Sequence, residues 1–153
     1  MKSLLRYLML SSVLSLSVSY VASADEMMMA RITQDFPEAM LRLQEQLKKQ
    51  GYTISRVQRV DIGLTKSGYK TDKYRVVFYG KPDETRYISQ HYPELTPYLP
   101  LKIAIFAEAD DTMMIAANPV ILAPKANKEL RQQLKSWEKD LQALLATMKT
   151  PVD

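Results

Sequence analysis

The chain has 153 residues, a formal net charge of +4 and no cysteine. The absence of cysteine excludes disulfide bonds, thiolate catalysis and cysteine-ligated metal clusters, so the fold must be stabilised by packing alone. Two of the basic residues, Lys2 and Arg6, lie in the first 24 residues, and without that segment the net charge falls to +2. This small charge removes the main compositional support for nucleic-acid binding.

The N-terminal segment has the features of a cleavable export signal. Basic residues precede an apolar run from Leu8 to Val21, which serines interrupt. The run is too short and too polar for a membrane-spanning helix, which needs about 20 apolar residues. Small residues then lead to a cleavage site between Ala24 and Asp25. We therefore expect residues 1–24 to be a signal peptide, residues 25–153 to form a single domain, and the mature protein to be periplasmic.

The first half of the mature chain predicts three strands and one helix. Alternating residues predict a strand over 26–32, and an N-cap at Asp35 followed by apolar residues at helical spacing predicts a helix that ends at Gly51. Residues 52–62 predict a second strand, in which imperfect alternation indicates either a β-bulge or inward-pointing polar groups. After a turn at 65–68, residues 74–79 predict a third strand.

The second half predicts a short helix, a hairpin and a long helix. The stretch Lys81-Pro82-Asp83-Glu84 opens the short helix, which extends to about Gln90, and the prolines that follow it indicate a stiff irregular loop. Residues 101–107 and 112–117 predict two strands joined by an acidic turn. Beyond Pro124, leucines recur at helical spacing as far as Met148.

These elements follow one another in the order β-α-β-β-α-β-β-α. The order predicts an α+β fold related to ferredoxin-like sandwiches, with an antiparallel or mixed sheet of about five strands and helices packed on one face.

Several short motifs, taken together in their order and spacing, resemble the family called domain of unknown function 302. The motifs are the helix Phe36-Pro37-Glu38-Ala39-Met40-Leu41-Arg42-Leu43, Lys49-Gln50-Gly51-Tyr52, Tyr79-Gly80-Lys81-Pro82, Tyr98-Leu99-Pro100-Leu101 and Asn118-Pro119. The resemblance covers about Met27 to Met148 and implies a small α+β domain, often dimeric, with no agreed activity and no catalytic residues to transfer. The motif Gly80-Lys81-Pro82 often reads Gly-Asn-Pro in that family, so Lys81 takes the place of the asparagine here.

Tyrosines and an imperfectly alternating strand suggest a ligand pocket. If the strand face with the polar residues points inward, aromatic rings from the following elements wall a half-polar space suited to a small anionic or aromatic ligand. The candidate residues are Arg56, Gln58, Tyr74, Tyr79, Tyr92 and Tyr98. The alternative is that these tyrosines pack with their hydroxyl groups at the surface.

Methionines suggest a metal site of a different kind. Thioethers are soft ligands that suit Cu(I), and Met27, Met29 and Met113 are the candidates. The alternative is that they fill gaps in a core, since neighbouring methionines on a strand point to opposite faces. We predict no cofactor.

The remaining candidates have simpler interpretations. The single histidine, His91, has no evident nucleophile or orienting group nearby in the sequence, and the acidic pair Asp110 and Asp111 suits a turn better than a metal site.

Basic residues form a stripe on the last helix, opposite its leucines. They are Lys128, Arg131, Lys135 and Lys139. Such a stripe suits anionic lipid headgroups or an acidic partner, although it is also typical of a solvated face, and Glu129, Glu138 and Asp140 dilute it.

Three functional classes fit these observations. We favour a non-enzymatic module that binds a small ligand or acts as an accessory protein. The alternatives are a homodimeric interaction module, in which a second copy covers the sheet edges, and an enzyme of unknown reaction whose groups converge from distant positions.

Overall fold

The structure is a computed structural model that describes residues 26–150. The elements are β1 (Met27–Ile32), α1 (Phe36–Lys49), β2 (Thr53–Arg59), α2 (Val60–Lys66), β3 (Tyr74–Gly80), α3 (Pro82–His91), the 3-10 helix η1 (Pro93–Tyr98), β4 (Leu101–Glu108), β5 (Asp111–Ala117), the 3-10 helix η2 (Pro119–Leu122) and α4 (Lys128–Lys149). The expected signal peptide and its cleavage site at Ala24 and Asp25 lie outside the described residues. Within residues 26–150, no helix is long and apolar enough to cross a membrane.

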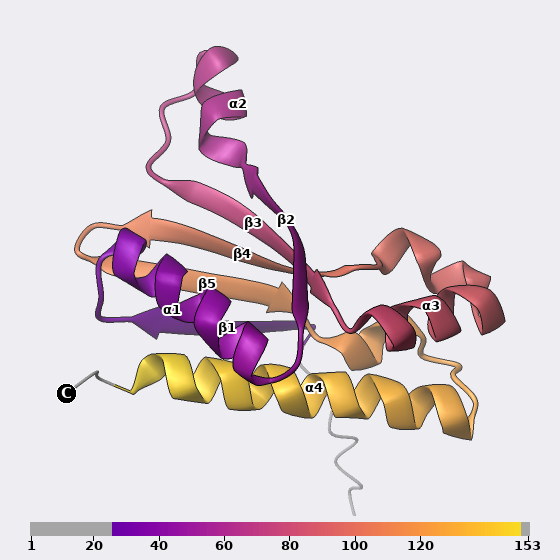
Figure 1. The fold of residues 1–153 in the computed structure, drawn as a ribbon. Helices are drawn as coiled ribbons and strands as arrows, with labels where there is room; N and C mark the ends of the chain where they lie inside the picture. The colour runs from indigo at the N-terminus through magenta and orange to yellow at the C-terminus, as the bar shows by residue number, and fades with distance from the viewer. Residues whose placement is uncertain (1–25, 151–153) are drawn as a thin grey trace, which may run out of the picture.

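The strands form one five-stranded sheet in the order β1-β5-β4-β3-β2 (Figure 1). Every neighbouring pair is antiparallel. In this order β1 and β2, which follow one another in the chain, lie at opposite edges. The expected α+β class is confirmed, and of the two sheet types left open by the sequence the antiparallel one is observed.

The helix α1 begins and ends where local signals place it. The Asp35 carboxylate accepts a hydrogen bond from the Glu38 amide at 3.0 Å, which satisfies one of the free N–H groups of the first turn. Gly51, with φ +80°, follows the last turn in the left-handed conformation that glycine adopts at low cost. Between these ends the helix buries one apolar face, which includes Leu43 and Leu47.

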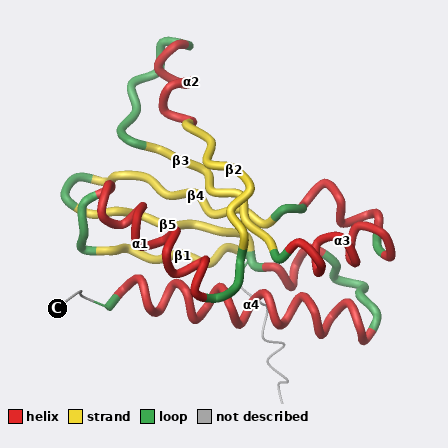
Figure 2. Tube along the Cα trace, in the orientation of Figure 1, coloured by secondary structure: helices red, strands yellow, loops and turns green. Residues whose placement is uncertain are grey.

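The two long helices cover the same face of the sheet. Asn127 caps α4 by accepting a hydrogen bond from the Leu130 amide at 2.9 Å, and the apolar face of this helix is fully buried from Leu130 to Met148. Figures 1 and 2 show α1 and α4 side by side against the strands. Packing one sheet face against two amphipathic helices creates the single core, which also contains Val77, Ile103 and Met114.

The segment after β2 differs from the sequence prediction. The strand ends at Arg59 instead of Ile62, and Val60–Lys66 forms α2, a short helix without buried residues. Figure 1 shows this helix projecting beyond the strands, where no neighbouring strand is available to pair with the chain. The bulge interpretation is confirmed, because the β2–β3 register shifts between Ile54 and Arg56.

Two proline-containing segments form 3-10 helices, and the first of them lies where the sequence predicts a stiff irregular loop. Pro93–Tyr98 forms η1 shortly before β4, and Pro119–Leu122 forms η2 shortly after β5. Since β4 and β5 are antiparallel neighbours, the two 3-10 helices lie at the same end of the sheet.

The sheet face opposite α1 and α4 remains partly exposed. We call it the open face. From the strand registers it carries Met27, Met29, Arg31, Arg56, Gln58, Tyr74, Val76, Phe78, Lys102, Ala104, Phe106, Met113, Ile115 and Ala117. The most exposed large apolar side chains among them are Met29, 54 % exposed, and Met27, 47 % exposed. Antiparallel sheets commonly leave one face in water, but that face is then polar, whereas most of this one is apolar.

Candidate functional site

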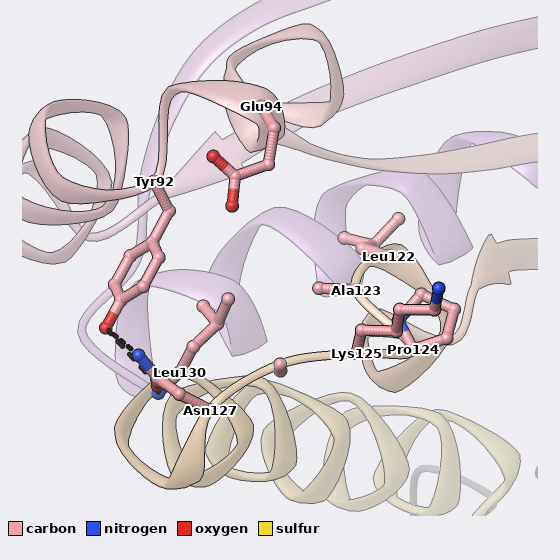
Figure 3. Close-up of a pocket in the computed structure, with 9 residues that line it drawn as sticks. Tyr92, Glu94, Leu122, Ala123, Pro124, Lys125, Asn127 and Leu130 are labelled. Carbon is pink, nitrogen blue, oxygen red and sulfur yellow. Dashed lines mark hydrogen bonds between the residues drawn. The ribbon is translucent and has the colours of Figure 1, made fainter.

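Two adjoining hollows lie beside the 3-10 helices. The first, the Tyr92 hollow, has a volume of about 490 Å³ and lies between the start of η1 and the segment that leads into α4 (Figure 3). Its lining residues are Tyr92, Glu94, Leu122, Ala123, Pro124, Lys125, Ala126, Asn127 and Leu130. The floor is apolar, and charged or hydrogen-bonding groups come from the rim.

The second, the Tyr98 hollow, has a volume of about 310 Å³ and opens on the open face. Its lining residues are Met27, Val76, Tyr79, Tyr98, Leu101, Lys102, Ala104, Ile115, Ala116, Ala117, Pro119 and Leu122. Leu122 lines both hollows, so they adjoin across this one side chain.

The polar rim of the Tyr92 hollow is held by hydrogen bonds. The Asn127 amide Nδ2 donates to Tyr92 Oη at 3.2 Å, while the Oδ1 atom of the same residue caps α4. Figure 3 shows the Glu94 carboxylate directed toward the open space between Tyr92 and Leu122. With Lys125 on the other wall, the rim offers groups of both charge signs to a ligand.

A denser polar cluster lies around Lys81, at the corner between β3 and α3. The Lys81 ammonium donates to Asp140 Oδ2 at 3.0 Å and lies 4.6 Å from the centre of the Tyr52 ring. The Tyr52 hydroxyl donates to the same carboxylate oxygen at 2.8 Å. Glu84, which also pairs with Lys81, accepts a hydrogen bond from the Trp137 indole N–H at 2.6 Å.

These contacts give the Lys81 cluster a structural role. It joins the ends of α1 and β3 to α4, and the Lys81 ammonium forms ion pairs with the carboxylates of both Asp140 and Glu84. Burial, followed by the hydrogen bond to Asp140, raises the pKa of Tyr52, so this phenol stays protonated and donates its proton to the carboxylate.

Comparison with known proteins places the chain in a family. The model described as "Domain of unknown function DUF302" matches residues 28–148, well over half of the chain. The chain belongs to the DUF302 family. No curated protein matches the DUF302 chain.

A solved structure supports the same fold for the DUF302 chain. The crystal structure of an uncharacterised conserved DUF302 protein from Bacillus stearothermophilus is similar, with a TM-score of 0.74 and 20 % sequence identity over 82 % of this chain and 99 % of that chain. At this identity the likeness shows the fold alone.

The structure separates the six predicted pocket residues of the DUF302 chain into two groups. Tyr79 and Tyr98 line the Tyr98 hollow, and Tyr92 lines the hollow beside it. The other three, Arg56, Gln58 and Tyr74, lie on the open face but line neither hollow. Arg56 is exposed, and Gln58 is half-buried opposite Val76.

Tyr79 contacts the Tyr98 hollow from the core side. It is only 3 % exposed, and its ring meets the Tyr52 ring edge-on with 5.1 Å between the centres. Burial raises its pKa above the ordinary value, with a further contribution from the negative charge of Asp140. This residue therefore shapes the wall of the hollow from beneath.

The three candidate copper ligands share one side of the sheet. Met27 and Met29 lie two residues apart on β1, and Met113 pairs with Arg31, the next outward residue of that strand. Met28, between them in the sequence, lies on the opposite face and packs against the core. The shared face is a necessary condition for a thioether site, and Cu(I) binding remains a prediction.

The single histidine is engaged in local contacts. The ring of exposed His91 stacks on Tyr87 with 4.1 Å between the centres, and its Nδ1 lies 2.9 Å from the Tyr87 carbonyl oxygen. Within residues 26–150 the His91 ring forms a hydrogen bond only with backbone, so this part of the chain supplies no base–nucleophile pair around it.

The acidic pair lies at the β4–β5 turn. Asp111 forms an ion pair with Arg31 at 3.1 Å, and Asp110 is exposed. In the described part of the chain, no group of three or more histidine, aspartate or glutamate side chains is placed to hold a metal ion.

Glu94, Leu122, Lys125 and Asn127 are among the residues of the hollows that sequence reasoning missed. Only Asn127 carried a usable signal, since an asparagine before a helical apolar pattern predicts an N-cap. The others lie in or next to proline-containing segments, and only the tertiary structure brings η1 and η2 together.

Proposed function

We propose that this chain is an exported, non-enzymatic binding module whose two adjoining hollows hold a small ligand with an aromatic or apolar body and an anionic group. The observation that carries the proposal is the pair of hollows that share Leu122, each apolar inside and each with a lysine in its lining. Their volumes of about 490 and about 310 Å³ are in the range that small ligands occupy.

Different residues around the hollows contact different parts of the proposed ligand. The rings of Tyr92 and Tyr98 offer apolar surface with few rotatable bonds, which suits an aromatic body. Lys125 and Lys102 offer positive charge to an anionic group at either end. Glu94 disfavours a ligand with negative charge on every side, and so contributes to selectivity.

Binding of the anionic aromatic dye 1-anilinonaphthalene-8-sulfonate tests this proposal. We expect a fluorescence increase that saturates with dye concentration and that falls severalfold when Ala123→Phe fills the Tyr92 hollow or Ala104→Phe fills the Tyr98 hollow. The matched control is Ala143→Phe, which adds the same ring to an exposed position of α4.

The dye titration has clear contrary outcomes. Circular dichroism first establishes that each variant is folded. No saturable fluorescence increase, or equal binding by all three phenylalanine variants, would exclude the hollows as the ligand site.

A second candidate function is a homodimeric interaction module, and the open face favours it. Soluble monomers rarely expose a large contiguous apolar surface, and this face is apolar across the middle of the sheet. A second copy packed on it would remove that surface from water.

Light scattering at micromolar concentration tests the dimer. We expect the mass of two chains for the wild type and of one chain for Met29→Asp, which places a charge on the open face. Leu41→Asp is the matched control, because Leu41 is an exposed apolar residue on α1, in the helix layer. A monomeric wild type would contradict the dimer proposal.

A further inference from the structure

We propose that the outer face of α4 is a docking surface for an anionic lipid bilayer. This inference goes beyond the proposed function, since α4 lies on the side of the sheet opposite the open face. The docking residues, which we call the cationic stripe, are Lys128, Arg131, Lys135 and Lys139.

The cationic stripe is a straight row of exposed side chains. Its members are spaced by three or four residues, which places them on one side of the helix. With a rise of about 1.5 Å per residue, the row is roughly 16 Å long. All four residues are exposed, and none of them forms an ion pair within residues 26–150. The stripe therefore presents four charges along one line.

The acidic residues of α4 are engaged elsewhere. Glu129 accepts hydrogen bonds from the hydroxyl groups of Tyr87 and Tyr92. Glu138 accepts a hydrogen bond from Asn118 Nδ2 at 2.8 Å.

The third acid, Asp140, belongs to the Lys81 cluster, where it accepts hydrogen bonds from Lys81 and Tyr52. In the sequence these three acids dilute the basic residues. In the structure each of them is bound to a residue outside α4, and within residues 26–150 none of them forms an ion pair with the stripe.

The chemistry of the surface selects a bilayer over a macromolecular partner. The apolar face of α4 is buried from Leu130 to Met148, and its exposed positions hold no aromatic or large apolar side chain. A protein interface relies on such anchors, and single-stranded nucleic acid relies on aromatic stacking. Adsorption to anionic headgroups requires only exposed basic side chains that can reach the bilayer surface together. Each such side chain strengthens binding about fivefold.

Vesicle sedimentation tests the docking surface. The purified protein is mixed with vesicles of phosphatidylcholine alone or with added phosphatidylglycerol, at low and high salt. We expect binding only to vesicles that contain phosphatidylglycerol, weakened by salt because exposed charges are screened. A variant with all four stripe residues replaced by Gln should lose at least a hundredfold in partition coefficient, at about fivefold per cation.

A control with the same change in net charge separates local from overall electrostatics. Arg59, Lys66, Lys70 and Lys73 are likewise exposed, and they lie near α2, away from α4. Replacing these four by Gln should leave binding within a few fold of the wild type. Equal losses in both variants, no preference for phosphatidylglycerol, or tight binding only to polyglutamate or DNA would overturn the proposal.

Discussion

Lys81 joins three parts of the chain through one ammonium group. Its position at the start of α3 brings the side chain over the Tyr52 ring and onto the Asp140 carboxylate, so α4 is fixed to the corner after β3. The preceding residue, Gly80, permits this corner because an added Cβ atom would lie 2.8 Å from the Thr85 hydroxyl oxygen. In the family resemblance this lysine replaces an asparagine, and here it makes an ion pair that an uncharged amide does not provide.

The same cluster predicts a loss of stability at alkaline pH. Burial raises the pKa of both Tyr52 and Tyr79 above the ordinary value of 10.0, and Asp140 raises both further. The unfolded chain therefore ionises first. Stability is complete below about pH 10 and is lost as pH rises toward the raised pKa values, by up to about 1.4 kcal/mol per pH unit for each tyrosine.

Urea unfolding followed by Trp137 fluorescence measures this pH dependence. Between about pH 9 and about 11, Tyr79→Phe and Tyr52→Phe should each reduce the slope of unfolding free energy against pH by removing one ionisation. Tyr69→Phe, which changes a ring that is 65 % exposed, is the control. An unchanged slope in both core variants would contradict the raised pKa values.

At the scale of elements, α2 shows where sequence periodicity fails. Residues 52–62 favour a strand by composition, yet the chain leaves the sheet after Arg59 and coils into a helix. Pairing of β2 with β3 ends at Arg59, and the residues that follow form local hydrogen bonds in a helix instead of a strand ladder. An ion pair between Asp61 and Arg75 holds this helix to β3.

Removing that ion pair should loosen the projecting segment. The Arg75 guanidinium holds the pKa of Asp61 below its ordinary value of 3.8, so the attraction is present above that pH and is lost as pH falls through the lowered pKa. We expect Asp61→Asn to speed amide exchange over Val60–Lys66 about 5- to 30-fold at neutral pH, which corresponds to about 1–2 kcal/mol.

Hydrogen–deuterium exchange resolved by residue measures this effect. The control is Asp72→Asn, an exposed aspartate in the same connection. If both variants exchange alike, the ion pair is not what holds α2.

At the scale of the whole molecule, one sheet separates two different surfaces. The helix layer seals the core on one side and carries the cationic stripe, while the open face is apolar and adjoins the Tyr98 hollow. The fully buried side chains of the helix side should therefore contribute most of the stability. Leu134→Ala should lower the free energy of unfolding by about 2–5 kcal/mol, because it empties a fully buried position of α4.

Chemical denaturation compares this change with the same substitution at an exposed site. Leu41 is 59 % exposed on α1, and Leu41→Ala should change stability by no more than about 0.5 kcal/mol. Similar losses at both positions would mean that the described core is wrong.

Much of the fold follows from local signals in the sequence. The caps at Asp35 and Asn127, the glycine after α1 and the alternation of β1 predict the observed elements, because each depends on neighbours within a few residues. The α+β class and the family follow from the order of these elements and motifs. The helix α2 and the helix η1 do not, since their local patterns are ambiguous without the surrounding structure.

The strand order, the open face and the hollows were decided by the tertiary structure. Alternation tells which side chains share a face, as for Met27 and Met29, but not whether a helix layer covers that face. Tyr92, Tyr98 and Lys125 come from segments that meet only because antiparallel pairing of β4 and β5 brings η1 and η2 to one end of the sheet. Contacts between residues distant in the sequence depend on global packing, which no local pattern records.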